Sequence, residues 1–240
     1  MVTIDCLDKD YKEVCDLVRS SQDSDITLKN VVGQRYIAAG IGGKNIKIEG
    51  VPGNALGAYM DGSNIEVMAS VQDAVGDTMN EGKIIVHGSS GDATGYAMRG
   101  GKIYINGDAG YRTGIHMKAY KEKFPVIIIG GKVGSFLGEY MAGGILVVLN
   151  LAGNKDIVGN FTGVGMHGGK IFLRAKEITS PLPPQVKCED ASEEDLKELE
   201  TYLVEYAKDF NLNEKNIMDE HFFVLKPNSA NPYKRLYTAN

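Results

Sequence analysis

The sequence predicts an all-β protein: a single-stranded right-handed parallel β-helix of about seven coils, capped by an N-terminal helix and by a C-terminal helix plus an extended tail. A unit of about nineteen residues recurs along the chain, glycine supplies 30 of the 240 residues, and short runs rich in isoleucine and valine follow each unit. Self-similarity at a fixed period is typical of solenoids. Glycine used this heavily indicates a backbone that turns at fixed places.

The repeat is defined by a glycine column and a methionine column. The segment Gly57-Ala58-Tyr59-Met60 recurs three times at steps of nineteen residues, then at steps of twenty-four and twenty-five. The glycines are expected at structural corners, where they permit positive φ: Gly57, Gly76, Gly95, Gly114, Gly138 and Gly163. The methionines are expected to form an interior ladder, in which a flexible thioether adapts to its neighbours: Met60, Met79, Met98, Met117, Met141 and Met166.

The strand-like runs must pair with their equivalents in neighbouring units. One unit is too short for a β-α-β crossover, so consecutive runs should lie parallel and about 4.8 Å apart. The runs cover residues 46–48, 65–68, 84–87, 103–106, 126–129, 145–149 and 171–173. Residues 118–125 interrupt the unit that begins at Gly114.

The two ends of the stack expose strand edges and need covers. Residues 1–26 are predicted to form an N-terminal helical cap, because apolar residues recur at helical spacing from Ile4 to Val18. Residues 27–175 form the β-helix. Residues 176–240 comprise a Pro-rich linker, a helix that begins after Ser192 with acidic residues in its first turn, and a tail.

Composition narrows the class of function. The net charge of −5 gives no reason to expect nucleic acid or an anionic membrane as partner. The longest apolar stretch, around residues 141–152, is too short and interrupted to cross a bilayer. Three widely separated cysteines without a CxxC pair indicate reduced thiols in a cytoplasmic protein, and they cannot by themselves hold an iron–sulfur cluster. A homo-oligomer is compatible with the sequence.

The repeat resembles the GXGXG domain of glutamate synthase, the C-terminal β-helix of that enzyme's large subunit. The resemblance covers roughly residues 27–175 and is clearest at 53–60 and 159–169, although Val164 stands where many family members carry lysine. The tail, with Lys226-Pro227 and residues 231–237, is similar to that of the free-standing archaeal-type subunit. A related β-helix occurs in a subunit of formylmethanofuran dehydrogenase.

The resemblance implies a scaffold whose chemistry lies on other chains. In glutamate synthase an amidotransferase domain releases ammonia from glutamine. A synthase domain carrying FMN and an iron–sulfur cluster adds the ammonia to 2-oxoglutarate and reduces the imine. We therefore expect a glutamine amidotransferase subunit and an FMN-binding synthase subunit as partners. On this chain we expect no catalytic residue, no cofactor and no metal.

Several motifs resemble patterns that bind nucleotides, metals or anions or that carry a reactive thiol. Residues 163–168 match the dinucleotide fingerprint GxGxxG, but no helical pattern follows and the glycines fall in the repeat columns. His116 and His167 flank the methionine column and lack an evident third metal ligand. Cys188 has no adjacent histidine to lower its pKa. A lysine follows the glycine that ends four of the units: Lys44, Lys83, Lys102 and Lys170. For this lysine column, a solvated and charge-balanced face is favoured over an anion-binding strip.

The interruption at residues 118–125 is the best candidate for partner docking. It is a basic, aromatic bulge on an otherwise regular solenoid, and we expect Lys121, Lys123 and Phe124 to contact a partner. One alternative function is an independent β-helix scaffold or binding module of another oxidoreductase complex. Another is an enzyme of the carbohydrate-active or acyltransferase kind, which the lack of a hexapeptide repeat and of a recurring carboxylate cluster disfavours.

Overall fold

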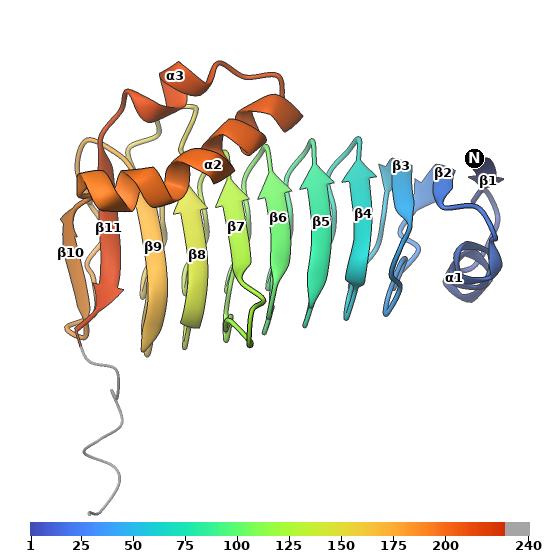
Figure 1. Ribbon diagram of the computed structural model, residues 1–240, viewed down its shortest axis with the longest axis horizontal. Coiled ribbons are helices and arrows are strands. Elements are labelled where there is room, and N and C mark those ends of the chain that lie inside the picture. Colours follow the sequence, from blue (N-terminus) through green and yellow to red (C-terminus); the bar gives the residue numbers. More distant parts are fainter. Residues whose placement is uncertain (229–240) are drawn as a thin grey trace, which may run out of the picture.

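The computed structural model describes residues 1–228 and places eleven strands in one sheet, in the order β1-β2-β3-β4-β5-β6-β7-β8-β9-β11-β10 (Figure 1). The first nine strands are parallel, and β11 pairs antiparallel with both β9 and β10. The strands are β1 Val2–Asp5, β2 Asp25–Val32, β3 Asn45–Val51, β4 Asp61–Val67, β5 Glu81–Val86, β6 Gly101–Ile105, β7 Pro125–Ile129, β8 Ala142–Val148, β9 Gly168–Arg174, β10 Val186–Asp190 and β11 Phe222–Pro227. The helices are α1 Tyr11–Ser20, α2 Glu193–Asp209 and α3 Glu214–Met218.

The strand register follows the repeat. Ile46 pairs with Ile65, Ile65 with Ile84 and Ile84 with Ile103, each nineteen residues further along. Several strands begin earlier than the apolar runs predicted, because the glycines that end the units, such as Gly82 and Gly101, also pair with the neighbouring strand. The register shifts between Asp61 and Ser63, on either side of a glycine with φ of 92°. A bulge with a left-handed glycine lets the strand continue through the corner.

Backbone hydrogen bonds also join consecutive units outside the sheet. The N–H of Gly76 donates to Leu56 O at 2.8 Å, and the N–H of Gly95 donates to Val75 O at 2.7 Å. Equivalent bonds recur at the later corners. The segments between the strands are therefore stacked in the same register as the strands, and their buried polar groups are satisfied by the units above and below.

The sheet has an apolar core on each face. Alternate strand residues, such as Ile103 and Ile105, point to one side and join the long core that also contains the buried methionines. Tyr104, between them, points to the other side into a second core with Ile128, Val147 and Phe172 from the neighbouring strands. The period of two along a strand explains the separation.

The second core lies beneath α2. Its buried residues Leu199, Leu203 and Ala207 recur on one face of the helix and pack on β6–β9. Figure 1 shows α2 crossing this part of the sheet, whereas no helix covers the same face over β2–β4. The helix therefore begins after Ser192 as the sequence predicts, but its predicted location as a cap on the end of the stack was wrong, because α2 covers a face of the sheet and the β11–β10 pair closes the end.

The N-terminal cap also differs from the expectation. Ile4 lies in strand β1, which pairs with β2, and the helix begins only after Asp10, whose carboxylate accepts from the N–H groups of Lys12 and Glu13. The edge of β2 offers backbone hydrogen bonds that an isolated first helical turn would not recover. Val14 and Val18 are buried as the helical spacing predicts. Most of the predicted tail, residues 229–240, lies outside the described residues.

Within residues 1–228, no helix combines the length and the apolar character needed to cross a membrane.

Candidate functional site

The corner turns carry the most unusual backbone of the molecule. In each turn three residues at alternate positions have positive φ, as in Ala93 (57°), Gly95 (70°) and Ala97 (49°). The pattern occurs in seven successive corners: 36/38/40, 55/57/59, 74/76/78, 93/95/97, 112/114/116, 136/138/140 and 161/163/165. The middle position is glycine in six of the seven corners, and Ala38 occupies it in the corner nearest the N-terminus.

The middle position faces the long core, which explains its glycine. All six predicted corner glycines have φ between 64° and 70°. A Cβ on Gly95 would lie 2.2 Å from Ile127 Cδ1, and one on Gly76 would lie 2.4 Å from Ile103 Cδ1. The methionines of the ladder, three residues after each glycine, are fully buried. Backbone conformation and space therefore both require glycine here.

The first position of the later corners carries bulky side chains in place of alanine. Residues 55, 74 and 93 are alanine, whereas Arg112, Phe136 and Phe161 follow at the equivalent positions with φ of 56–65°. Phe136 stacks on Phe161 with ring centroids 5.0 Å apart, and the Arg112 guanidinium lies 5.0 Å from the Phe136 ring. Large residues in the left-handed region are strained. Sequence reasoning missed this column, although its steps of twenty-four and twenty-five match those of the methionines.

The third position forms a second external stack. His116 lies nearly parallel to Tyr140, 5.2 Å between centroids, and the Tyr96 ring meets His116 edge-on at 5.9 Å. His116 is thus part of an aromatic stack. The other histidine considered for a metal site, His167, lies 3.3 Å from the carbonyl of Gly165. In the described part of the chain, no group of three or more His, Cys, Asp or Glu side chains is arranged to hold a metal ion.

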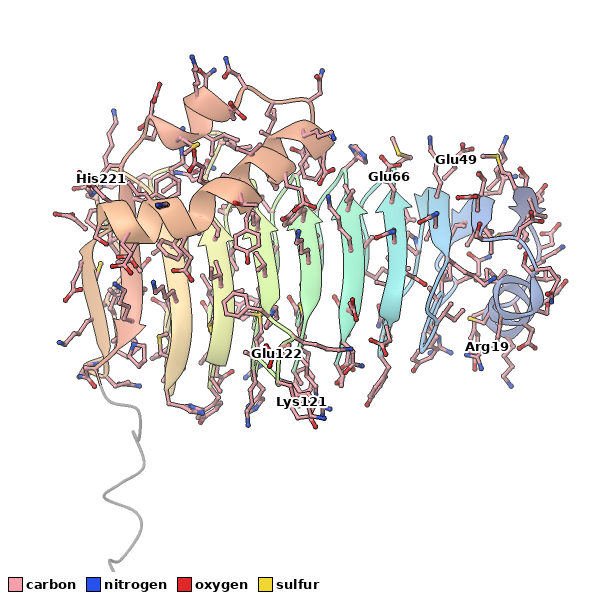
Figure 2. The ribbon with its side chains drawn as sticks, in the orientation of Figure 1. Arg19, Glu49, Glu66, Lys121, Glu122 and His221 are labelled. Atoms are coloured by element: carbon pink, nitrogen blue, oxygen red, sulfur yellow. The ribbon has the colours of Figure 1, made fainter. Side chains whose placement is uncertain are left out.

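The insertion at residues 118–125 projects beside these stacks, at the N-terminal end of β7, where Figure 2 labels Lys121 and Glu122. Lys121 is exposed and its ammonium lies 5.3 Å from the Tyr120 ring. Lys123, by contrast, is engaged within the molecule, because it pairs with Asp61 at 2.7 Å and with Glu81 at 3.5 Å. Phe124 is 41% exposed and borders a groove of about 540 Å³ together with Tyr202 of α2. Of the three residues predicted to dock a partner, Lys121 and Phe124 remain accessible.

The lysine column binds the segment next to α1 and helix α2 to the stack. Lys44 donates to the carbonyls of Ser21 and Asp23 next to α1, at 2.8 and 3.1 Å. Lys83 and Lys102 bind the carboxylate of Glu205 on α2 at 2.8 and 2.5 Å, and Lys83 also pairs with Asp209. Burial raises the pKa of Glu205, but the hydrogen bonds from Lys102 and Lys83 outweigh it and the net pKa is lowered. Lys83 and Lys102 are therefore neutralised inside the molecule and do not form an anion-binding strip.

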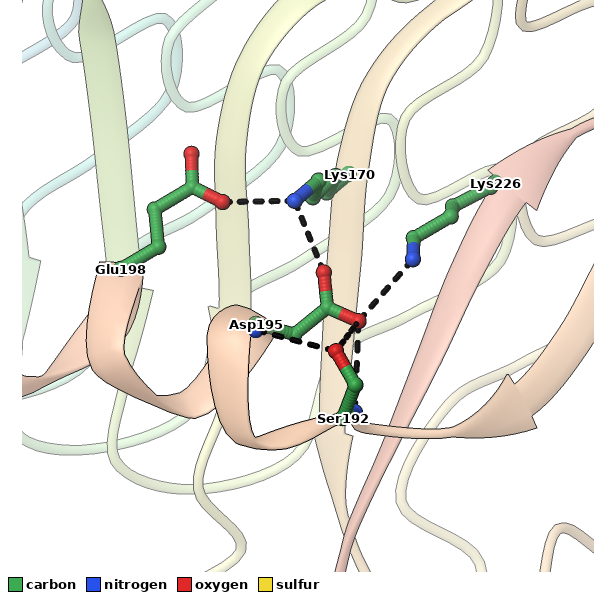
Figure 3. A network of polar contacts seen from close by, with 5 residues as sticks. All are labelled: Lys170, Ser192, Asp195, Glu198 and Lys226. Carbon is green, nitrogen blue, oxygen red and sulfur yellow. Dashed lines mark hydrogen bonds and ion pairs between the residues drawn. The ribbon is translucent and has the colours of Figure 1, made fainter.

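A second network holds the start of α2 (Figure 3). The Asp195 carboxylate accepts from Lys170 at 2.7 Å and from Lys226 at 2.9 Å, and it closes a capping box with Ser192. Its side chain is only 5% exposed. Burial opposes ionisation of Asp195, but the hydrogen bonds from Lys170, Lys226 and Ser192 outweigh burial and hold its pKa well below the usual range.

Replacing Asp195 by asparagine should remove an acid-sensitive part of the stability. The folded-state pKa is depressed, so the stabilisation is fully present above the unfolded-state pKa of about 4 and is lost as the pH falls toward the folded-state value. In urea titrations at pH 7 we expect Asp195→Asn to be less stable than the parent by about 1.5–3 kcal/mol. The difference should shrink between pH 5 and pH 3.

Glu198 provides the matched control. It binds the same Lys170 at 2.6 Å, but its side chain is 38% exposed, so screening should limit the effect of Glu198→Gln to less than about 1 kcal/mol. A difference between Asp195→Asn and the parent that stays constant over this pH range would contradict the assignment.

The remaining sequence motifs acquire structural explanations. The GxGxxG segment at residues 163–168 is the last corner turn and continues directly into β9, not into a helix. Burial raises the pKa of the Cys6 thiol to about 11, and burial followed by Asp190 and Glu189 raises that of Cys188. Raised values disfavour the thiolate, which is the reactive form.

Comparison with known proteins identifies relatives of the whole chain. The family model described as GXGXG motif matches residues 12–228. An uncharacterized protein of Methanocaldococcus jannaschii, MJ1350, is 44% identical over 99% of this chain and 96% of its own length. Among solved structures, a chain of the formyltransferase/hydrolase complex (FhcABCD) from Methylorubrum extorquens in complex with methylofuran has a similar fold. Its TM-score is 0.64 at 18% identity, over 92% of this chain and 89% of that chain.

Proposed function

The chain belongs to the GXGXG motif family, and from that membership we propose that it is a non-catalytic scaffold subunit of a glutamate-synthase-type complex. In this proposal the chain holds a glutamine amidotransferase subunit and an FMN-binding synthase subunit in register. FMN and an iron–sulfur cluster belong to the synthase subunit, and glutamate forms there from glutamine and 2-oxoglutarate. The family match across nearly the whole chain carries the proposal.

The architecture that we propose for the scaffold is a right-handed parallel β-helix of about seven coils. The seven corner turns, the parallel strands in sequential order and the backbone hydrogen bonds between corners support it. Such a stack presents rigid, regularly spaced surfaces on which several subunits can bind at fixed distances. The internal pairing of the lysine column and the raised thiol pKa values are consistent with a structural role.

An independent scaffold for another oxidoreductase complex is the second candidate. The fold similarity to a chain of a multisubunit formyltransferase/hydrolase complex favours it, because that complex also assembles several polypeptides. The two candidates differ in their partner subunits and not in the fold of this chain.

Purification tests the proposal directly. The isolated chain should show no flavin absorbance and no glutamine-dependent formation of glutamate. The affinity-tagged chain purified from the native host should carry the amidotransferase and synthase subunits, and the assembled complex should form glutamate with a flavin spectrum. Robust activity of the isolated chain would refute the scaffold role, and capture of a different set of subunits would favour the second candidate.

A further inference from the structure

Three cations gather on one corner of a chain whose net charge is −5. Arg99 and Lys118 are exposed and stand on successive units, since their N–H groups donate to Met79 O at 2.9 Å and Met98 O at 3.0 Å. Lys121 follows within the insertion. Among residues 1–228, no carboxylate lies within ion-pair distance of these three side chains. At other corner-to-strand junctions Lys83, Lys102 and Lys170 are paired with carboxylates, which sets this group apart.

An aromatic ring lies beside two of these cations, Arg99 and Lys121. The Tyr120 ring lies 6.0 Å from the Arg99 guanidinium and 5.3 Å from the Lys121 ammonium. On the neighbouring units, His116 packs against Tyr96 at 5.9 Å, and its side chain emerges two residues before Lys118. Contacts of this kind restrict long side chains before a ligand arrives, which lowers the entropy cost of binding.

The fold does not require these side chains. Tyr96, His116 and Tyr120 belong to neither apolar core, and Tyr96 and Tyr120 are 41% and 47% exposed. His116 and Lys121 have φ of 55° and 56°, conformations that cost free energy in a non-glycine residue. Tyrosine and arginine side chains are enriched at the energetically important positions of interfaces, and non-glycine residues at positive φ cluster at functional sites.

We propose that this basic–aromatic patch, formed by Tyr96, Arg99, His116, Lys118, Tyr120 and Lys121, docks an acidic segment of a partner subunit. The proposal rests on the scaffold role and names the surface by which one partner is held. Unpaired cations select carboxylates, and the rings accommodate the apolar parts of the same segment. A nucleic acid is disfavoured, because three cations on an acidic chain supply little of the phosphate neutralisation on which such binding depends.

Charge reversal tests the surface. The variant Arg99→Glu/Lys118→Glu/Lys121→Glu would be compared with Lys155→Glu/Lys176→Glu/Lys197→Glu, which makes a closely similar change in net charge at three exposed lysines elsewhere. Each tagged chain replaces the native gene, and co-purifying subunits are quantified by mass spectrometry after nuclease treatment. With the patch variant, the amount of one co-purifying partner subunit should fall about tenfold or more relative to the parent. The control should recover it at the parent's level, and both variants should melt near the parent temperature.

A second measurement identifies the chemistry of the partner. A carbodiimide joins lysine amines directly to carboxylates, so treatment of the parent complex should link Lys118 and Lys121 to Asp or Glu residues of that subunit. Equal recovery by the patch variant, or cross-links only from other lysines, would overturn the docking assignment. Loss of the partner after nuclease treatment of the parent would overturn it in favour of a nucleic acid. If the parent itself carries no amidotransferase or synthase subunit, the proposed function fails, independently of the patch.

Discussion

Replacing Gly95 by valine should lower the free energy of unfolding by about 2–5 kcal/mol. The left-handed backbone at φ of 70° costs an L-residue about 1–2 kcal/mol. The new Cβ would lie 2.2 Å from Ile127 Cδ1 on β7, and overpacking of this kind costs about 1–3 kcal/mol. Urea denaturation of parent and variant at neutral pH would measure the difference.

Gly40→Val separates the two contributions. Gly40 has φ of 64°, but no atom lies within 4 Å of the position its Cβ would occupy. This variant should therefore lose only the backbone contribution of about 1–2 kcal/mol. Equal losses in the two variants would show that the interior contact with Ile127 is unimportant, and a negligible loss in both would contradict the corner conformation itself.

Replacing Met98 by alanine should cost about 2–5 kcal/mol, the range observed for large-to-small substitutions in cores. Met98 is fully buried between Met79 and Met117 of the adjoining units, so a cavity there has neighbours on both sides. Relaxation of the flexible neighbouring methionines would place the result at the lower end of the range. Chemical denaturation again supplies the measurement.

Met68 serves as the matched control for the methionine ladder. It has the same side chain but is 44% exposed just after the end of β4, and Met68→Ala should change stability by less than about 0.5 kcal/mol. A loss for Met98→Ala within error of that for Met68→Ala would contradict an interior ladder.

The repeat made much of the fold predictable from sequence alone. A fixed step of nineteen residues aligns Ile46, Ile65, Ile84 and Ile103, so the parallel order of the strands follows from chain length and period. The glycine column predicted positive φ at the middle of each corner. It did not predict the left-handed residues on either side, because alanine, threonine, tyrosine and phenylalanine carry no sequence signal for that conformation.

The terminal segments were predictable in type but not in place. The spacing of Leu199, Leu203 and Ala207 predicts an amphipathic helix, and nothing in that spacing says which apolar surface the helix will cover. The answer depends on the outer residues Tyr104, Ile128 and Val147, whose alternation with inner residues makes β6–β8 apolar on both faces. Such continuous apolar runs indicate a strand buried on both sides, and this signal could have located α2.

The candidate docking surface illustrates the same limit. The sequence located the insertion at residues 118–125, but the patch also needs Tyr96 and Arg99 from the preceding unit. Those residues adjoin the insertion only after the units stack. The sequence also grouped Lys123 with Lys121, whereas the structure pairs Lys123 with Asp61 across two units. Whether a surface lysine is paired depends on contacts between units that are distant in the chain.

Helix α2 should make the unfolding of the stack more cooperative. A solenoid without such a helix is coupled only between adjacent repeats, so disruption can begin anywhere and remain local. Here α2 binds Lys83 of β5 at one end and Lys170 of β9 at the other, and Tyr206 bonds to Ile105 O at 3.1 Å between them. One continuous element therefore links five strands, and separating any of them disturbs the others. We therefore expect the second half of the molecule to unfold as a single cooperative unit, whereas β1–β4 should retain the repeat-by-repeat behaviour of a simple linear array.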